Sequence, residues 1–194
     1  MATVTLKPAA LSTDITPAAP YTTSTGTLTD SWQLIDDITS DSDYITYDDT
    51  QGAHQWILYD IGPLPADFVG ADAGTTYVFR VRTYITGYFN DVTTLTCWLV
   101  GPNHTITQGI AATGDGWAGS NGFNWTPRLD GIQFPTTLTT STYSGSILTA
   151  GENASTADWS NAKLAIGWSK SNNMGGDNTQ LFISAIEIDI IDYV

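Results

Sequence analysis

The chain has few cationic residues and few of the side chains that bind transition metals. Its 194 residues include six Lys and Arg, two His and one Cys, against twenty Asp and Glu, so the net charge is −14. A chain this acidic is repelled by phosphate, which argues against direct binding of DNA or RNA. One cysteine excludes an intramolecular disulfide, and one Cys with two His argues against a zinc site.

Long apolar runs are also missing. No stretch approaches the roughly 18 apolar residues of a membrane span. The opening MATVTLKPAALSTDITPAAP lacks the continuous apolar region of a signal peptide. The sequence therefore predicts no membrane association, and a protein that is made and kept in a cytoplasm until an assembly event.

Polar positions are filled by Ser, Thr, Asn, Asp and Gly, which together with 11% aromatic residues favours β-strands joined by turns. The clearest strand is TTYVFRVRTYIT, in which Phe79 and Val81 alternate with Arg80 and Arg82. One apolar face and one basic face indicate a half-buried antiparallel strand. In TTLTCWLV, Cys97 alternates with leucines in the same way, so we expect a buried, unreactive thiol.

Similar strand signals recur along the chain, and no amphipathic helical pattern exceeds about ten residues. A short turn or helical piece is expected at 156–162. In the last strand we expect one face to carry Phe182, Ile186, Ile188 and Ile190, while Glu187 and Asp189 point outward. The other predicted strands lie in TLTDSWQLIDDI, DYITY, HQWILYDI, TLTTSTYSGSILT and KLAIGW. Eight or nine strands around one core predict an all-β fold, a two-sheet antiparallel sandwich with jelly-roll-like connections.

The first 27 residues differ from the rest. Pro8, Pro17 and Pro20 are separated mainly by Ala and Thr. Proline fixes φ and removes a backbone donor, so we expect neither a helix nor an inner strand here. The predicted organisation is an extended N-terminal arm over residues 1–27 and a β-sandwich domain over 28–194. The arm is either a disordered leader or a segment laid on a neighbouring subunit.

Catalytic patterns are sparse. His54 starts a predicted strand and His104 lies in a predicted turn, and neither accompanies a nucleophile motif. Only two of the twenty acidic residues are glutamates, and most aspartates lie in turn-like segments. We therefore predict that the protein is not an enzyme, with no catalytic residue and no cofactor.

The segment DDITSDSDYITYDD concentrates six aspartates in fourteen residues. Asp41 and Asp43 have the first spacing of a calcium-binding EF-hand loop, but the glycine and glutamate that the loop requires are absent. The main interpretation is that the carboxylates keep a sheet edge next to Ile45 from pairing with a neighbour. The alternative is a different kind of calcium site, with ligands from Asp36, Asp37, Asp41 and Asp43.

A long Gly- and Asn-rich excursion, residues 108–135, carries three large aromatic side chains, Trp117, Phe123 and Trp125. Three exposed aromatic rings in one loop would be costly. Two interpretations remain: the rings pack on the sandwich or at a subunit interface, or they stack against the sugar rings of a glycan.

Four segments together resemble structural β-sandwich proteins of tailed bacteriophages: DSWQLIDDITSDSDYI, TYVFRVRTYITG, DWSNAKLAIGW and QLFISAIEIDIIDY. The shared pattern is a Trp-containing first strand with an acidic Asp-Tyr-Ile step, a Trp-led segment before the penultimate strand, and a last strand that alternates acidic and aliphatic residues. The likeness covers residues 28–194 and is a pattern of strands, with no catalytic motif.

The resemblance implies a structural protein located in the virion and made in the host cytoplasm. The expected role is a capsid decoration or cement protein that binds the major capsid protein or other virion proteins, as a homo-oligomer such as a trimer. The alternative is a tail or fibre component, including a carbohydrate- or receptor-binding module. Neither role involves nucleic acid or a membrane.

Overall fold

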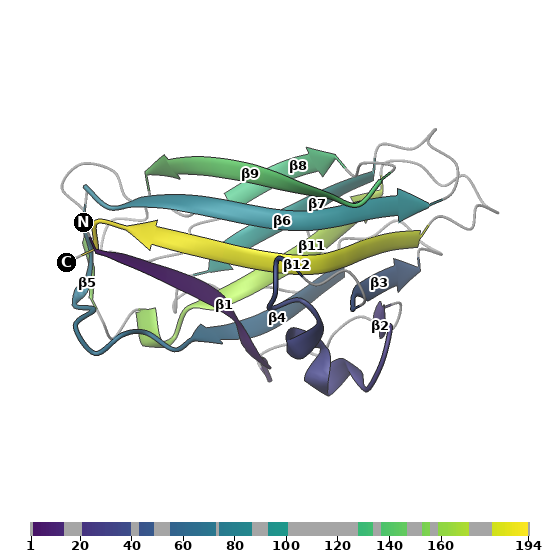
Figure 1. Ribbon diagram of the computed structural model, residues 1–194, viewed down its shortest axis with the longest axis horizontal. Coiled ribbons are helices and arrows are strands. Elements are labelled where there is room, and N and C mark those ends of the chain that lie inside the picture. The colour runs from purple at the N-terminus through teal and green to yellow at the C-terminus, as the bar shows by residue number, and fades with distance from the viewer. Residues whose placement is uncertain are drawn as a thin grey trace.

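The protein is an all-β chain in the computed structural model, as the sequence predicts (Figure 1). The structure describes residues 2–13, 21–39, 43–48, 55–72, 74–86, 93–100, 128–133, 137–146, 153–155, 159–170 and 180–193. The described elements are β1 (Thr3–Leu11), β2 (Tyr21–Thr23), the 3₁₀ helix η1 (Leu28–Leu34), β3 (Ile45–Asp48), β4 (Gln55–Gly62), β5 (Gly70–Asp72), β6 (Thr76–Thr86), β7 (Thr93–Val100), β8 (Arg128–Gln133), β9 (Thr139–Ser146), β10 (Asn153–Ser155), β11 (Lys163–Lys170) and β12 (Gln180–Ile191).

Ten of the strands form one continuous antiparallel sheet that is arranged in two layers (Figure 1). The front layer contains β9, β6, β12, β3 and β2, and the rear layer contains β4, β11, β7 and β8. Strand β1 joins them, because Thr3–Leu6 pair with β12 and Lys7–Leu11 pair with β4. The two remaining strands, β5 and β10, pair with each other. The predicted jelly-roll connectivity of two separate sheets stays a prediction.

Strand β1 corrects the prediction of an N-terminal arm. Its first half lies beside β12, and Leu6 is 1% exposed in the core. Pro8 is tolerated because the pairing with β4 shifts register between Pro8 and Ala10, at a point where a regular ladder bond is lost in any case. Strand β2, also within the expected arm, pairs with β3. Residues 14–20 lie outside the described part of the chain.

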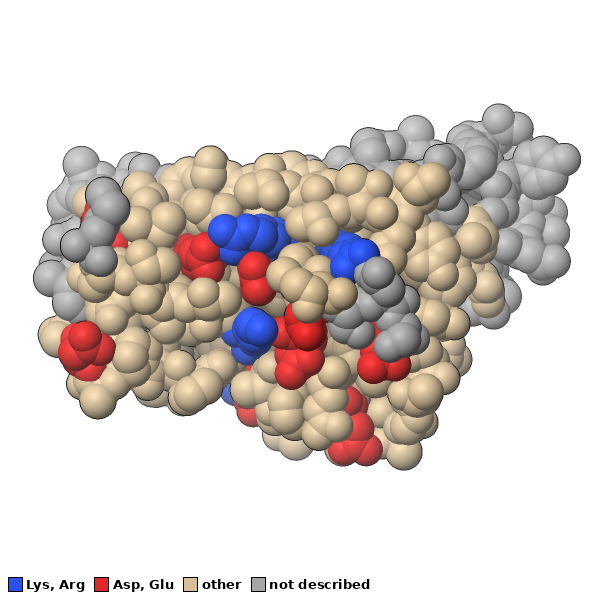
Figure 2. Space-filling view, in the orientation of Figure 1, with Lys and Arg blue, Asp and Glu red and all other residues tan. Residues whose placement is uncertain are grey.

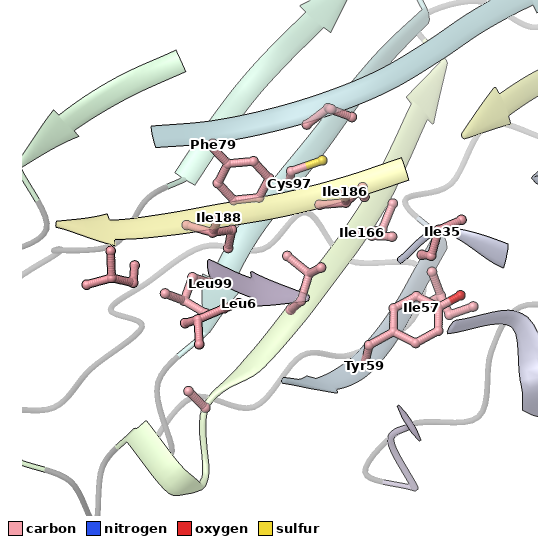
Figure 3. Packing of buried hydrophobic residues seen from close by; sticks show 14 of the residues in the cluster. Leu6, Ile35, Ile57, Tyr59, Phe79, Cys97, Leu99, Ile166, Ile186 and Ile188 are labelled. Atoms are coloured by element: carbon pink, nitrogen blue, oxygen red, sulfur yellow. The ribbon is translucent and has the colours of Figure 1, made fainter. Parts of the chain in front are cut away.

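The core lies between the two layers, and side chains from both meet there (Figure 3). Phe79, Ile186 and Ile188 come from the front layer, whereas Ile166 and Leu99 come from the rear layer. The alternation predicted for residues 75–86 is confirmed, because Phe79, Val81 and Thr83 are fully buried between half-exposed neighbours. This pattern fixes which face of β6 remains accessible.

Cys97 is buried in the same core, as its position among leucines predicts. Burial raises the pKa of its thiol well above the usual range, because the thiolate would lose its hydration. The thiol is therefore not a reactive group in the folded protein.

Strand β12 is the long central strand of the front layer and contains a bulge. Its pairing with β6 shifts between Ile183 and Ala185, so the alternation of faces changes at Ser184. Ile183 and Ile186 therefore both enter the core, whereas Phe182 packs with Tyr84 instead. The prediction that Phe182 shares a face with Ile186 is wrong for this reason.

Residues 28–34, expected as part of a strand, form the 3₁₀ helix η1. Its first turn is closed by Thr27: the Thr27 carbonyl accepts from the Asp30 N–H at 3.0 Å, and the Thr27 hydroxyl donates to Asp30 Oδ2 at 2.8 Å. The residue that follows the helix still bonds to the sheet: the Ile186 N–H of β12 donates to the Ile35 carbonyl at 2.9 Å. The helical turn expected at 156–162 is present in its described part, at Trp159 and Ser160. The described helical segments include none that is long and apolar enough to cross a membrane.

Candidate functional site

The aromatic residues proposed for an interface or a glycan, Trp117, Phe123 and Trp125, lie outside the described residues. The same is true of His54 and His104. The candidate site must therefore be built from the strands, whose side-chain positions are described.

Three of the four aspartates proposed for calcium are described. Asp37 is exposed, and its Oδ1 accepts from the Thr39 N–H at 2.8 Å and from the Thr39 hydroxyl at 2.7 Å. These two bonds lower the pKa of Asp37 and form a local turn. Asp36 and Asp43 are half-buried, and Asp41 lies outside the described residues.

A calcium site there stays a prediction. Within the described ranges, no three His, Cys, Asp or Glu side chains are grouped so that they could hold a metal.

We predicted that these aspartates prevent a free sheet edge at Ile45 from pairing with another chain. For β3 this prediction is wrong. Ile45 and its neighbours pair with β12 on one side and with Tyr21–Thr23 of β2 on the other. Strand β3 is therefore internal, and β2 covers the edge that the carboxylates were expected to protect.

The best-defined polar arrangement lies on the outer face of the front layer, where β1, β12 and β6 are neighbours. Arg80 of β6 contacts two carboxylates of β12: its Nη1 lies 3.0 Å from Glu187 Oε1, and its Nη2 lies 2.8 Å from Asp189 Oδ2. The Thr5 hydroxyl of β1 donates to Asp189 Oδ1 at 2.7 Å. Together with Arg82, these residues are called the outer-face cluster.

The geometry of the cluster follows from the strand register. Arg80 pairs directly with Glu187, and Asp189 is paired with Thr5 on its other side. Residues two apart in a strand share a face, so Glu187 and Asp189 both reach the fork of one guanidinium group. The side chains are partly shielded from water, with 30% of Arg80, 12% of Glu187 and 16% of Asp189 exposed.

The ion pair between Arg80 and Asp189 shifts the pKa of both groups. Burial raises the pKa of Asp189, but the hydrogen bonds from Arg80 and Thr5 and the Arg80 charge outweigh it, so the pKa lies below its usual value. The hydrogen bond to Asp189 in turn raises the pKa of Arg80. Arg80 and Asp189 therefore stay charged and paired at neutral pH.

Arg82 extends the cluster towards η1, because its Nη1 donates to the Ile38 carbonyl at 2.9 Å. The charges of Arg82 and Lys7 also favour the ionised form of Asp37. Figure 2 shows that the visible Lys and Arg side chains gather in the middle of this face, next to Asp and Glu. Charges of both signs therefore balance one another here, on a chain that is strongly acidic overall.

Three aromatic rings adjoin the cluster on the same layer. Phe182 and Tyr84 are stacked, with ring centroids 4.1 Å apart and planes 6° from parallel, and Tyr44 meets the edge of Phe182 at 5.0 Å. Such pairs add about 0.5–1.5 kcal/mol beyond the area that they bury. One face of Phe182 is used in this stack, and the ring is only 7% exposed.

The arrangement is suited to holding strands together. The carboxylates of Glu187 and Asp189 are engaged by Arg80, and Asp189 also accepts from the Thr5 hydroxyl of β1. The sequence predicted each half of the cluster, a basic face on β6 and an acidic face on the last strand. It did not predict that the two halves meet, because the strands are more than 100 residues apart along the chain.

A comparison with models of known protein families finds no match, and no curated protein is similar enough to indicate a family.

Proposed function

We propose that this protein is a non-enzymatic structural component of a tailed-phage virion, acting as a capsid decoration or cement protein. The resemblance of its sequence pattern to phage β-sandwich proteins supports the virion role, although the Trp32 segment of that pattern is the helix η1 and not a strand. The observation that carries the non-enzymatic role is that the charged groups of the outer-face cluster are used to join β1, β12 and β6.

The surface and core chemistry are consistent with this proposal. The thiol of Cys97 and the phenol of Tyr59 are buried, and burial raises the pKa of each. The Tyr59 hydroxyl lies 2.8 Å from the Ser31 hydroxyl, where it ties β4 to η1. A net charge of −14 keeps decorated particles mutually repelled and soluble.

The proposed partners are the major capsid protein or other virion proteins, and further copies of the chain in a homo-oligomer such as a trimer. Deleting residues 1–26 is not a useful test of attachment, because the deletion would remove β1 and its pairing with both layers. The attachment test needs the intact chain.

The experiment is to purify particles of the phage that encodes the chain through a density gradient and to quantify the chain by mass spectrometry. We expect the chain in the particle band, and in the head fraction after heads and tails are separated. Particles assembled without the gene should lose resistance to heat or osmotic shock. Recovery of the chain only in the soluble lysate would contradict the virion role.

The second candidate function is a tail or fibre module that binds a carbohydrate receptor. It is favoured by the three aromatic residues of the long excursion, Trp117, Phe123 and Trp125. A glycan array with the full chain tests it, with Trp117→Ala and Trp125→Ala as controls. Absence of binding by the parent chain would remove this candidate, and recovery of the chain in the tail fraction would favour it.

A further inference from the structure

Strand β9 is an edge of the front layer. Its eight residues pair with β6 from Thr139 opposite Thr83 to Ser146 opposite Thr76, without a register shift. In the described part of the chain, β9 has no strand partner on its other side. Alternate backbone N–H and C=O groups of an antiparallel edge strand point away from the sheet, so β9 offers a regular row of donors and acceptors.

The sequence of β9 lacks the features that usually protect such an edge. Thr139–Ser146 reads TTSTYSGS, with no charge and no proline. Thr140, Thr142 and Ser144 are exposed on the same face as Arg80 and Arg82. Edge strands that stay free are normally kept short, bulged, or marked with Lys or Pro.

The other edges of the sheet do have such features. Strand β2, at the opposite end of the front layer, is only three residues long. Strand β8, at the edge of the rear layer, contains Arg128 and Asp130, and its pairing with β7 shifts register between Leu95 and Cys97. Of the described edges, β9 is therefore the one that is long, regular and uncharged.

The inner face of β9 holds the strand in place for pairing. Tyr143 packs against the core, and the Tyr77 ring lies over Gly145, where a Cβ would be 3.1 Å from the ring. An aromatic ring across from a glycine stabilises an edge strand that would otherwise be weakened there. The strand is thus anchored on one face, and among the described residues no strand lies against its outer edge.

We propose that β9 pairs with β9 of a second copy of this chain, antiparallel across a two-fold axis, so that the two front layers become one continuous sheet. The distribution of charge supports a second copy of the chain as the partner of β9. A chain with a net charge of −14 repels its own copies over most of its surface, and the strip over β9, along the upper margin of Figure 2, carries no Lys, Arg, Asp or Glu.

Antiparallel pairing of a strand with itself is self-complementary, as a two-fold interface requires. Thr and Ser side chains directly opposite each other can also exchange hydrogen bonds across the new strand pair. The pairing does not depend on the virion role, since the isolated chain should form it in solution. A pair of edge strands buries less than about 1,000 Å², so we expect a weak dimer.

The first test compares Thr142→Glu with Thr142→Gln by sedimentation equilibrium of the full chain. Thr142 lies opposite Arg80, so a glutamate there is tolerated within one copy. In the dimer, the two glutamates would approach each other near the axis. We expect the parent chain and Thr142→Gln to dimerise alike, and Thr142→Glu to dissociate at least about tenfold more readily.

The second test is oxidative cross-linking of single cysteines placed at Thr140, Thr142 and Ser144. The chain's own Cys97 is buried, so each new thiol is the accessible one. In a two-fold pair, cross-linking should peak sharply at the position nearest the axis, which also gives the register. Val69→Cys is the matched control, because Val69 is 65% exposed and lies outside β9.

Two results would overturn the proposal. One is a parent chain that stays monomeric at about 100 μM, a concentration that would populate even a weak edge-strand dimer. The other is an oligomer whose dissociation constant is the same for Thr142→Glu and Thr142→Gln, with cross-linking no greater on β9 than at Val69. Either result would leave the virion proposal standing, because particle binding is measured separately.

Discussion

The two layers of the sheet differ in what their outer faces do. On the front layer, the outer face of β6 and β12 carries the paired charges of Arg80, Glu187 and Asp189. On the rear layer, the outer face of β4 and its neighbours carries a second apolar cluster of buried side chains: Trp56, Leu58, Val100 and Ala165. The front layer is therefore buried on one face, whereas the central rear strands are buried on both.

The sequences of the strands account for this difference in burial between the two layers. In β6, apolar and charged residues alternate, because one face meets the core and the other meets water. In β4, the run WILY is continuous: Ile57 and Tyr59 enter the main core, while Trp56 and Leu58 enter the second cluster. A continuous apolar run of this length indicates a strand covered on both faces.

The largest expected effect comes from removing the main side chain of the rear outer face. Trp56 is 1% exposed, so Trp56→Ala deletes a large buried ring and leaves a cavity. We expect the free energy of unfolding to fall by about 3–5 kcal/mol. Chemical denaturation followed by circular dichroism measures this free energy. A loss below about 1 kcal/mol, typical of an exposed site, would mean that the rear outer face is no more buried than the front one.

A smaller effect is expected from Gly167→Ala, on the strand next to Trp56. A Cβ at Gly167 would lie 2.3 Å from Trp56 Cζ3, which the buried ring cannot avoid by a small shift. We expect a loss of about 1–3 kcal/mol in the free energy of unfolding.

The double variant Trp56→Ala/Gly167→Ala sharpens this test. Once the ring is absent, the added methyl group has space, so the two losses should not add. Gly145→Ala is the matched control on the front layer, because the half-buried Tyr77 ring beside it can move. A Gly167→Ala cost that is unchanged in the Trp56→Ala background would contradict the contact.

The smallest effect is expected from the charges of the front outer face. Arg80→Met should lower the free energy of unfolding by about 1 kcal/mol or less at neutral pH, and less at high salt, because the pair is partly exposed.

The same pair predicts a pH dependence. The pKa of Asp189 is lower in the folded chain than in the unfolded one, so its contribution is present above the unfolded value, about 3.9, and is lost as the pH falls through the folded value. Both Arg80→Met and Asp189→Asn should therefore flatten the acid limb of a plot of unfolding free energy against pH. An acid limb identical to that of the parent chain would show that the pair does not contribute.

Period-two patterns in the sequence were sufficient to predict the fold class and the orientation of β6. They failed where a single residue changes the geometry. The bulge at Ser184 moved Phe182 out of the core face, and a Thr–Asp turn made residues 28–34 helical. Neither event changes the apolar pattern, so neither could be predicted from it.

Pairing between segments far apart in the sequence accounts for the remaining differences between the predictions and the structure. Pro8 suggested an arm, yet β1 is held by β12 from the far end of the chain and tolerates the proline at a register shift. Long-range pairing is also the reason that the candidate site could not be predicted. Arg80 and Asp189 were each expected on an exposed face, but their contact depends on the order of the strands in the sheet. Sequence patterns give the face of a residue more readily than its neighbour.

The pairing of β1 with β12 also determines how this chain can acquire its structure. Val4 lies opposite Ile190, so β1, which is synthesised well before β12, cannot form its front-layer bonds until β12 has been made. Contacts between such distant segments must overcome a large loss of chain entropy, which slows folding. Until β12 emerges, the apolar side chains of β1 have no partner on that side, and the growing chain depends on its high negative charge to stay dispersed.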